Sequence, residues 1–162
     1  MKYAGLKYND TVDGEGICVS FWAQGCPHHC PNCHNPETWS FKGGMEVPSD
    51  IKGQLIKAIS ANGVQRNCSF LGGEPLCQEN LELIKSLVEA VRIAYPSIKI
   101  FVWTGYTIEE LQVKRRVSEP LDFILSHIDV LIDGRYIQEE RDITLKWRGS
   151  RNQRILYQGK DF

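Results

Sequence analysis

The sequence has no long hydrophobic run, almost no net charge and no apolar leader. None of its 162 residues lies in a stretch approaching the roughly 20 apolar residues that a membrane-spanning helix requires. The formal net charge is −1, which gives no electrostatic basis for binding nucleic acid or a membrane surface. Repeats are absent, and Met1 and Lys2 are followed by polar residues where a signal peptide needs an apolar segment. These absences predict a single domain over residues 1–162, in the cytoplasm, with no nucleic-acid or membrane partner.

The segment GCPHHCPNCHNPETW, residues 25–39, lacks the fourth cysteine that would close a four-thiolate metal site. Its cysteines follow the spacing C-x3-C-x2-C and are Cys26, Cys30 and Cys33. In a cytoplasmic chain such cysteines serve as thiols or metal ligands rather than disulfides. Pro27 and Pro31 follow the first two cysteines, and proline disfavours the α conformation in the residue before it. The segment is therefore predicted to be a loop that wraps its thiolates around a metal centre.

Two kinds of metal centre are compatible with three clustered cysteines. A structural zinc site needs four ligands, so zinc would recruit His28, His29 or His34 and make the chain a binding module without catalysis. A four-iron, four-sulfur cluster on three cysteines leaves one iron without a protein ligand, and His28 and His29 are then expected to be exposed. A catalytic metal keeps an open coordination position, so in this alternative the missing cysteine creates the place where substrate binds.

The hydrophobic pattern predicts alternating strands and helices. Strands are expected at 17–23, 67–71, 98–103 and 129–133, with two further β-like runs at 143–147 and 154–157. Helices are expected between a cap at Ser49 and a stop at Asn62, between Asn80 and Tyr95, and from a capping box at Thr107 onward. This alternation indicates an α/β fold with mostly parallel strands. Because the chain is shorter than the roughly 250 residues of an eight-fold barrel, an open partial (β/α) barrel is predicted.

Three motifs follow predicted parallel strands directly: the cysteine loop, Gly72-Gly73-Glu74-Pro75 and Thr104-Gly105. The carboxyl ends of parallel strands share one edge, and the sites of α/β proteins form at that edge. Two glycines allow the backbone to approach a ligand closely, and a carboxylate can pair with an ammonium group. We therefore expect a common mouth that contains Gly72, Gly73, Glu74, Thr104 and, after the next strand, Asp133.

The cysteine loop and the GGEP motif together resemble the signature of radical S-adenosylmethionine enzymes. The resemblance implies a [4Fe-4S] cluster on the three cysteines, with S-adenosyl-L-methionine bound at the fourth iron through its amino and carboxylate groups. Reductive cleavage then releases methionine and a 5′-deoxyadenosyl radical that abstracts hydrogen. The GGEP motif is implied to meet the methionine amino group. Many members place an aromatic residue before the third cysteine to flank adenine, whereas here Asn32 and His34 lie on either side of Cys33.

Four further segments are similar to one subgroup of that family, the activating proteins of anaerobic ribonucleoside-triphosphate reductase. The segments are CHNPETW (33–39), WTGYTIEEL (103–111), DVLIDGRY (129–136) and RGSRNQRI (148–155). The resemblance implies that the radical takes hydrogen from a glycine of the reductase large subunit. It also implies a low-potential electron donor such as flavodoxin or ferredoxin. Asp133, Arg148 and Asn152 are expected near the rim where the reductase docks.

Other functions remain open at this point. The chain could activate another glycyl radical enzyme, or it could be a small radical enzyme that acts on a free metabolite. The zinc-binding interaction module is the alternative without catalysis. The short chain favours a macromolecular target, because a full barrel can enclose a small substrate whereas an open one leaves room for a protein segment.

Overall fold

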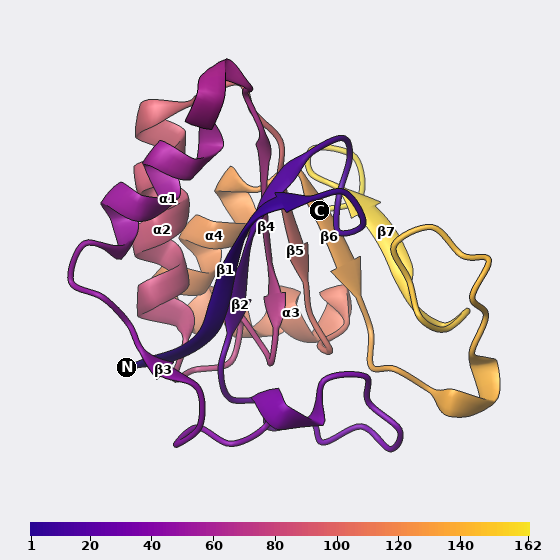
Figure 1. The fold of residues 1–162 in the computed structure, drawn as a ribbon. Helices are drawn as coiled ribbons and strands as arrows, with labels where there is room; N and C mark the ends of the chain where they lie inside the picture. The colour runs from indigo at the N-terminus through magenta and orange to yellow at the C-terminus, as the bar shows by residue number, and fades with distance from the viewer.

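Seven strands form one mixed sheet in the computed structural model, which describes all 162 residues (Figure 1). The strands are β1 (Lys2–Asp10), β2 (Cys18–Ala23), β3 (Met45–Glu46), β4 (Asn67–Gly72), β5 (Ile100–Trp103), β6 (Val130–Asp133) and β7 (Arg154–Tyr157). Their spatial order is β3-β1-β2-β4-β5-β6-β7. Strands β2, β4, β5 and β6 pair in parallel, and β1, β3 and β7 pair antiparallel at the margins. The predicted α/β class with a parallel centre is confirmed.

The helices connect the parallel strands. They are α1 (Ile51–Ile59), α2 (Leu81–Ala94), α3 (Ile108–Lys114) and α4 (Glu119–His127), with short 3-10 helices at Pro36–Thr38, Ala61–Gly63, Arg115–Val117 and Gln138–Glu140. Helix α2 packs between α1 and α4 along the sheet, and α3 lies at the lower ends of the strands in Figure 1. No helix is both long and apolar enough to traverse a membrane.

Alternation along the strands divides the apolar side chains between two faces of the sheet. The main core includes Phe21 and Phe70 from the strands and the buried stripe of α2. On the opposite face Phe101, Val130 and Ile132 form a second apolar cluster, which Trp103, Trp147 and Ile155 extend. No residue of this second cluster belongs to a helix. One face of the sheet therefore carries the helical layer, and the other is free to line a site.

Most of the predicted elements are confirmed. The strands expected at 17–23, 67–71, 98–103, 129–133 and 154–157 correspond to β2, β4, β5, β6 and β7. The predicted capping box of α3 is present, because the side chains of Thr107 and Glu110 each bond the other residue's backbone N–H. The cap predicted at Ser49 is wrong: Asp50 occupies the N-cap of α1, and no side chain caps that helix.

The strand predicted at 143–147 is wrong, because this segment forms turns. The backbone N–H and the hydroxyl of Thr144 both donate to Asp142 Oδ1, at 2.9 and 2.6 Å, which favours a tight turn over a sheet ladder. Ile143 is 81% exposed, and Trp147 has the left-handed backbone value φ 59°. The indole N–H of Trp103 donates to the Trp147 carbonyl at 2.8 Å. The apolar residues of this segment thus do not pair with the sheet.

The hydrophobic pattern did not reveal β1, β3 and α4. Strand β1, which lies between β3 and β2, has only two buried residues, so it lacks the hydrophobic run that marks a buried strand. Between β5 and β6 the chain forms two helices, separated by the 3-10 turn Arg115–Val117, where one was expected. Ser118 caps α4 by accepting a hydrogen bond from the Leu121 N–H, and Pro120 lies in its first turn. A capping serine followed by a proline in the first turn is a known signal for the start of a helix, and it could have revealed α4 from the sequence.

Replacing Thr107 with alanine tests how firmly α3 is anchored beneath the sheet. Loss of the cap removes the hydrogen bond from the Glu110 N–H, so the free energy of unfolding should fall by about 1 kcal/mol. Urea unfolding followed by circular dichroism measures the change. Thr11→Ala is the matched control, because Thr11 is exposed and its hydroxyl forms no hydrogen bond. An equal loss in both variants would contradict the cap's contribution.

Candidate functional site

A cavity of about 270 Å³ lies at the carboxyl ends of the parallel strands, on the face without helices. We call it the main cavity. Its walls come from the cysteine loop, the turn after β4, the end of β5 and the segment after β6. The lining includes Cys26, Cys30, Cys33, Gly72, Gly73, Glu74 and Thr104. The predicted convergence of the three motifs at one mouth is therefore confirmed.

The cysteine loop is irregular, as predicted, and its two ends are fastened to each other. The Gly25 N–H donates to the Thr38 carbonyl at 2.7 Å, and the Cys26 N–H donates to the Trp39 carbonyl at 3.0 Å. The side-chain amide of Gln24 reaches across the base of the loop to the carbonyls of Glu37 and Ser40. These bonds hold a loop that has no regular secondary structure between the cysteines.

All six cysteines of the chain are free, and the three of the motif line the main cavity. Burial raises the pKa of the Cys26 thiol to about 11, and burial also raises the pKa of Cys30. Both groups are therefore protonated at neutral pH in the metal-free protein. Metal ions bind the thiolate, so loading of this site must release these protons. Cys18, Cys68 and Cys77 are buried elsewhere and do not line this cavity.

The three histidines of the motif are each held by an aromatic ring. The ring of His28 meets Tyr106 edge-on at 4.6 Å, His29 stacks on Trp39 at 4.7 Å, and His34 meets Tyr136 at 5.1 Å. His29 is exposed as expected, but the prediction of an exposed His28 is wrong, because its side chain is only 6% exposed.

No three His, Cys, Asp or Glu side chains are arranged to hold a single metal ion. A zinc site on these cysteines would need a histidine as its fourth ligand, and His28 Nε2 is already engaged with Glu74 Oε2 at 2.8 Å. In a [4Fe-4S] cluster each cysteine binds a different iron, so the thiolates surround a larger group. Three thiols spread over the wall of one cavity fit such a cluster.

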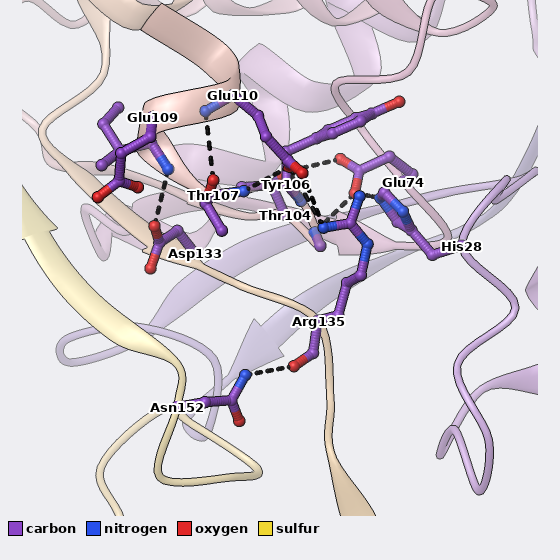
Figure 2. Close-up of polar contacts among 12 residues, drawn as sticks. His28, Glu74, Thr104, Tyr106, Thr107, Glu109, Glu110, Asp133, Arg135 and Asn152 are labelled. Carbon is purple, nitrogen blue, oxygen red and sulfur yellow. Dashed lines mark hydrogen bonds and ion pairs between the residues drawn. The ribbon is translucent and has the colours of Figure 1, made fainter.

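The Glu74 carboxylate is the buried centre of the hydrogen bonds around the site (Figure 2). Its Oε1 accepts from the Leu76 N–H at 2.9 Å and the Thr104 hydroxyl at 2.8 Å. Its Oε2 accepts from the Gly105 N–H at 2.7 Å and lies 2.8 Å from His28 Nε2. Because a carboxylate oxygen can only accept, His28 Nε2 carries the proton. One carboxylate therefore ties the ends of β4 and β5 to the cysteine loop.

The glycine turn after β4 has no room for side chains. A Cβ at Gly73 would lie 2.5 Å from the Gly25 carbonyl oxygen. Gly72 has φ +105°, and a Cβ there would lie 2.7 Å from the Ala23 carbonyl oxygen. The Glu74 N–H donates to the Gly25 carbonyl at 2.8 Å. The turn and the start of the cysteine loop are thus in direct backbone contact. This close approach explains the two glycines in the way that the sequence predicted.

The remaining predicted site residues divide into two groups. Thr104 lies in the wall and His34 at the exposed edge of the main cavity. Asn32 is exposed and does not line it. Asp133 ends β6 but faces away: its carboxylate accepts from the Ile108 N–H at 2.8 Å (Figure 2). It also accepts from the Arg154 guanidinium at 2.6 and 3.0 Å. Asp133 thus anchors α3 and β7 rather than lining the cavity.

Most of the aromatic lining was not predicted from the sequence. All four tryptophans of the chain line the main cavity, at Trp22, Trp39, Trp103 and Trp147. Tyr136 and Gln153 contribute from the segment after β6. Trp22 and Trp103 sit on strands at positions that alternate away from the helical face, which is the one signal available in the sequence. The lining is therefore largely apolar above the thiols.

The turn between β1 and β2 contributes to the lining of the main cavity from the opposite end of the strands. Asp13 lines the cavity, and a Cβ at Gly14 would meet Cys18 Sγ at 2.7 Å and Ser69 Oγ at 3.0 Å. Burial and a hydrogen bond with Asp10 raise the pKa of Asp13 to about 7. Burial opposes ionisation of Asp10 too, but the hydrogen bonds that it accepts lower its pKa overall. Asp10 Oδ2 is buried and accepts no hydrogen bond in the structure.

Comparison with known proteins first defines the class of this site. Residues 12–156 match the family model described as a 4Fe-4S single cluster domain. Among similar curated proteins, one from Haemophilus influenzae is 36% identical over 96% of this chain and 97% of its own length. One from Escherichia coli K12 is 34% identical over 89% and 90%, and one from Enterobacteria phage T4 is 33% identical over 96% and 93%. Each is named anaerobic ribonucleoside-triphosphate reductase-activating protein. The chain belongs to this family of activating proteins.

Changing Glu74 to glutamine tests the hydrogen-bonded centre. Whichever way the amide is oriented, its NH₂ group faces a backbone N–H, of Leu76 or of Gly105. An unmatched buried donor costs about 1–3 kcal/mol, so the thermal midpoint should fall and the cysteine loop should loosen. The measurements are the unfolding midpoint of metal-free protein and its iron content after reconstitution. Glu37→Gln, at an exposed carboxylate beside the loop, should change neither. A Glu74 variant with unchanged midpoint and iron content would show that the centre carries no stability.

Changing Asp13 to asparagine tests the shared proton. The folded pKa of about 7 exceeds the ordinary value of 3.8, so between these values the folded state binds more protons than the unfolded state. The free energy of unfolding should therefore fall as the pH rises from about 4 to 7. Asparagine can donate to Asp10 at every pH, so at pH 8 the variant should melt at a higher temperature than the wild-type protein. The difference should be about 2–4 °C for each kcal/mol gained in the free energy of unfolding. Melting curves at pH 5 and pH 8 measure this, and an equal difference at both would contradict it.

Proposed function

We propose that the protein is a radical S-adenosylmethionine activase that generates a glycyl radical on anaerobic ribonucleoside-triphosphate reductase. The observation that carries the proposal is the set of three cysteine thiols that line one cavity together with the glycine turn after β4. The names of the relatives supply the target. The sheet, with its parallel centre and one face free of helices, is in this proposal the open partial barrel of that family.

Cys26, Cys30 and Cys33 would each hold one iron of a [4Fe-4S] cluster and leave the fourth iron open to the main cavity. When bound and reduced, such a cluster supplies one electron for cleaving the sulfonium of S-adenosylmethionine. The overall change would balance: one electron and one S-adenosylmethionine would give methionine and a deoxyadenosyl radical. A hydrogen atom from the glycine Cα would then pass to that radical and leave 5′-deoxyadenosine and the glycyl radical.

S-adenosylmethionine would lie between the cysteine loop and the ends of β4 and β5. The Glu74 carboxylate already accepts four hydrogen bonds from the chain. In this proposal the backbone of Gly72-Gly73, rather than the Glu74 side chain, contacts the methionine amino group, because the absence of side chains allows close approach there. His34, next to the third cysteine, remains the candidate neighbour of adenine, with Thr104 in the wall, whereas Asn32 lies outside the lining. The direction of Asp133 gives it a structural role in this proposal.

The chain must also keep water from a reactive radical. The four tryptophans give the main cavity apolar walls, and the segment after β6, which contains many exposed residues, forms another part of the lining. We propose that the glycine loop of the reductase enters here and completes the enclosure. Arg148 and Asn152 lie in this segment, and Asn152 Nδ2 donates to the Arg135 carbonyl at 2.7 Å (Figure 2). Arg148, which is half-buried and forms no ion pair, is the docking candidate.

Two alternatives retain the same chemistry. Activation of another glycyl radical enzyme would use the same site with a different partner. Action on a free metabolite would require the main cavity to enclose the substrate without help from a partner. The relatives, which share 89–97% coverage with this chain and a single name, favour the reductase.

The test mixes anaerobically reconstituted, reduced protein with S-adenosylmethionine and a reductase whose glycine is intact. A glycyl-radical doublet should appear by electron paramagnetic resonance, and 5′-deoxyadenosine should form in amounts that depend on the reductase. Cys30→Ala should abolish both signals. Arg148→Ala should lower the rate of radical formation several-fold with unchanged iron content, whereas Lys57→Ala on the remote helix α1 should have no effect.

Two results would overturn the proposal. The first is one tightly bound zinc with no uptake of iron. The second is a loaded protein that consumes a small molecule while a competent reductase acquires no radical.

A further inference from the structure

A second cavity of about 420 Å³ lies on the far side of the cysteine loop. Its walls come from Pro27, the turn between β4 and α2, the end of α3 and the start of α4. The lining residues that matter here are Pro27, Cys77, Glu79, Tyr106, Lys114 and Val117. Nothing in the proposed radical chemistry uses this cavity.

Three consecutive residues separate the two cavities. Cys26 and His28 line the main cavity, and Pro27 between them lines the second cavity. A partner seated in the second cavity would therefore be one residue of chain away from a cluster-bearing cysteine. One-electron transfer weakens steeply with distance, so an electron donor must reach the surface nearest the cluster. The reductase would occupy the opening of the main cavity, and the second cavity remains accessible from outside.

The rim of the second cavity combines exposed apolar side chains with unpaired positive charges. Val117 is 92% exposed and Val113 is 61% exposed. Lys114 lies over the Tyr106 ring at 5.0 Å and forms no ion pair, and exposed Arg116 has none either. Exposed apolar residues with uncompensated charge mark an interaction surface, and the sign of the charge selects the partner.

The neighbouring charges leave the rim positive. Arg115, between the two unpaired cations, is neutralised by Asp122 at 2.7 Å. Arg135, on the other side of Tyr106, is neutralised by Glu110 at 3.1 Å. Glu79 is the one acidic residue of the lining. The two free cations therefore outweigh the single carboxylate, and the surface fits an acidic protein.

We propose that the second cavity and its rim, Val113 to Val117 with Pro27, dock a small acidic one-electron carrier protein that reduces the cluster. This inference rests on the proposed function, because it assumes a cluster on the three cysteines. It adds the place and the chemistry of the electron donor. In the step, one electron leaves the reduced carrier and enters the cluster through the Cys26–His28 segment, and no bond or proton is transferred.

The experiment reverses both free charges with Lys114→Glu/Arg116→Glu. Reduction of the reconstituted cluster by flavodoxin hydroquinone, followed by optical bleaching, should slow by about tenfold or more at low salt and lose its dependence on ionic strength. Flavodoxin binding, measured by titration calorimetry, should weaken in parallel. Reduction by dithionite should be unchanged. The matched control is Lys52→Glu/Lys57→Glu, which reverses two exposed, unpaired lysines on α1.

Unchanged carrier-driven reduction in the Lys114/Arg116 variant would overturn the inference, as would an equal loss in the control. Normal carrier-driven reduction combined with failure to activate the reductase would also overturn it and assign the surface to the reductase. Should the double variant lose iron, Arg116→Glu alone applies the same test at an exposed side chain. The proposed function is tested apart from this, because dithionite-reduced wild-type protein must still form the glycyl radical.

Discussion

A single buried carboxylate organises the site. Glu74 is 1% exposed, and a charge so placed is tolerated only when donors surround it. Its donors come from three segments: the turn after β4, the turn after β5 and the cysteine loop. They meet only if β4 and β5 pair in the observed parallel register and the cysteine loop folds back over both. The position of the thiols thus depends on the electrostatic satisfaction of a residue that binds no metal.

From this centre a continuous set of contacts reaches the segment after β6 (Figure 2). The Tyr106 ring lies against His28 on one side and 5.9 Å from the Arg135 guanidinium on the other. Arg135 pairs with Glu110, whose side chain caps α3, and its carbonyl accepts from Asn152. The rim proposed for the reductase and the loop proposed for the cluster therefore share one set of packed side chains. Their geometry is fixed together.

The parts of the site that the sequence predicted are those specified by short-range signals. Proline after cysteine indicates a loop, and a glycine pair after a strand indicates close backbone approach. The direction of Asp133 was not accessible, because it depends on Arg154 of β7 and the N–H of Ile108, both distant in sequence. The tryptophans were equally ambiguous, since an apolar residue on a strand suits a core or a cavity wall. The pattern predicted a strand through Trp147, because nothing in the sequence reveals its left-handed backbone conformation. That conformation occurs where the Trp103 indole N–H donates to the Trp147 carbonyl.

The turn at Asp13 and Gly14 gives the main cavity a floor. Because Gly14 packs against Cys18 and Ser69, a side chain at this position would push the turn away from the strands and change the shape of the cavity at this end. Under the proposed function, the space available to S-adenosylmethionine would thus depend on a glycine that lies far from the cysteine loop in the fold.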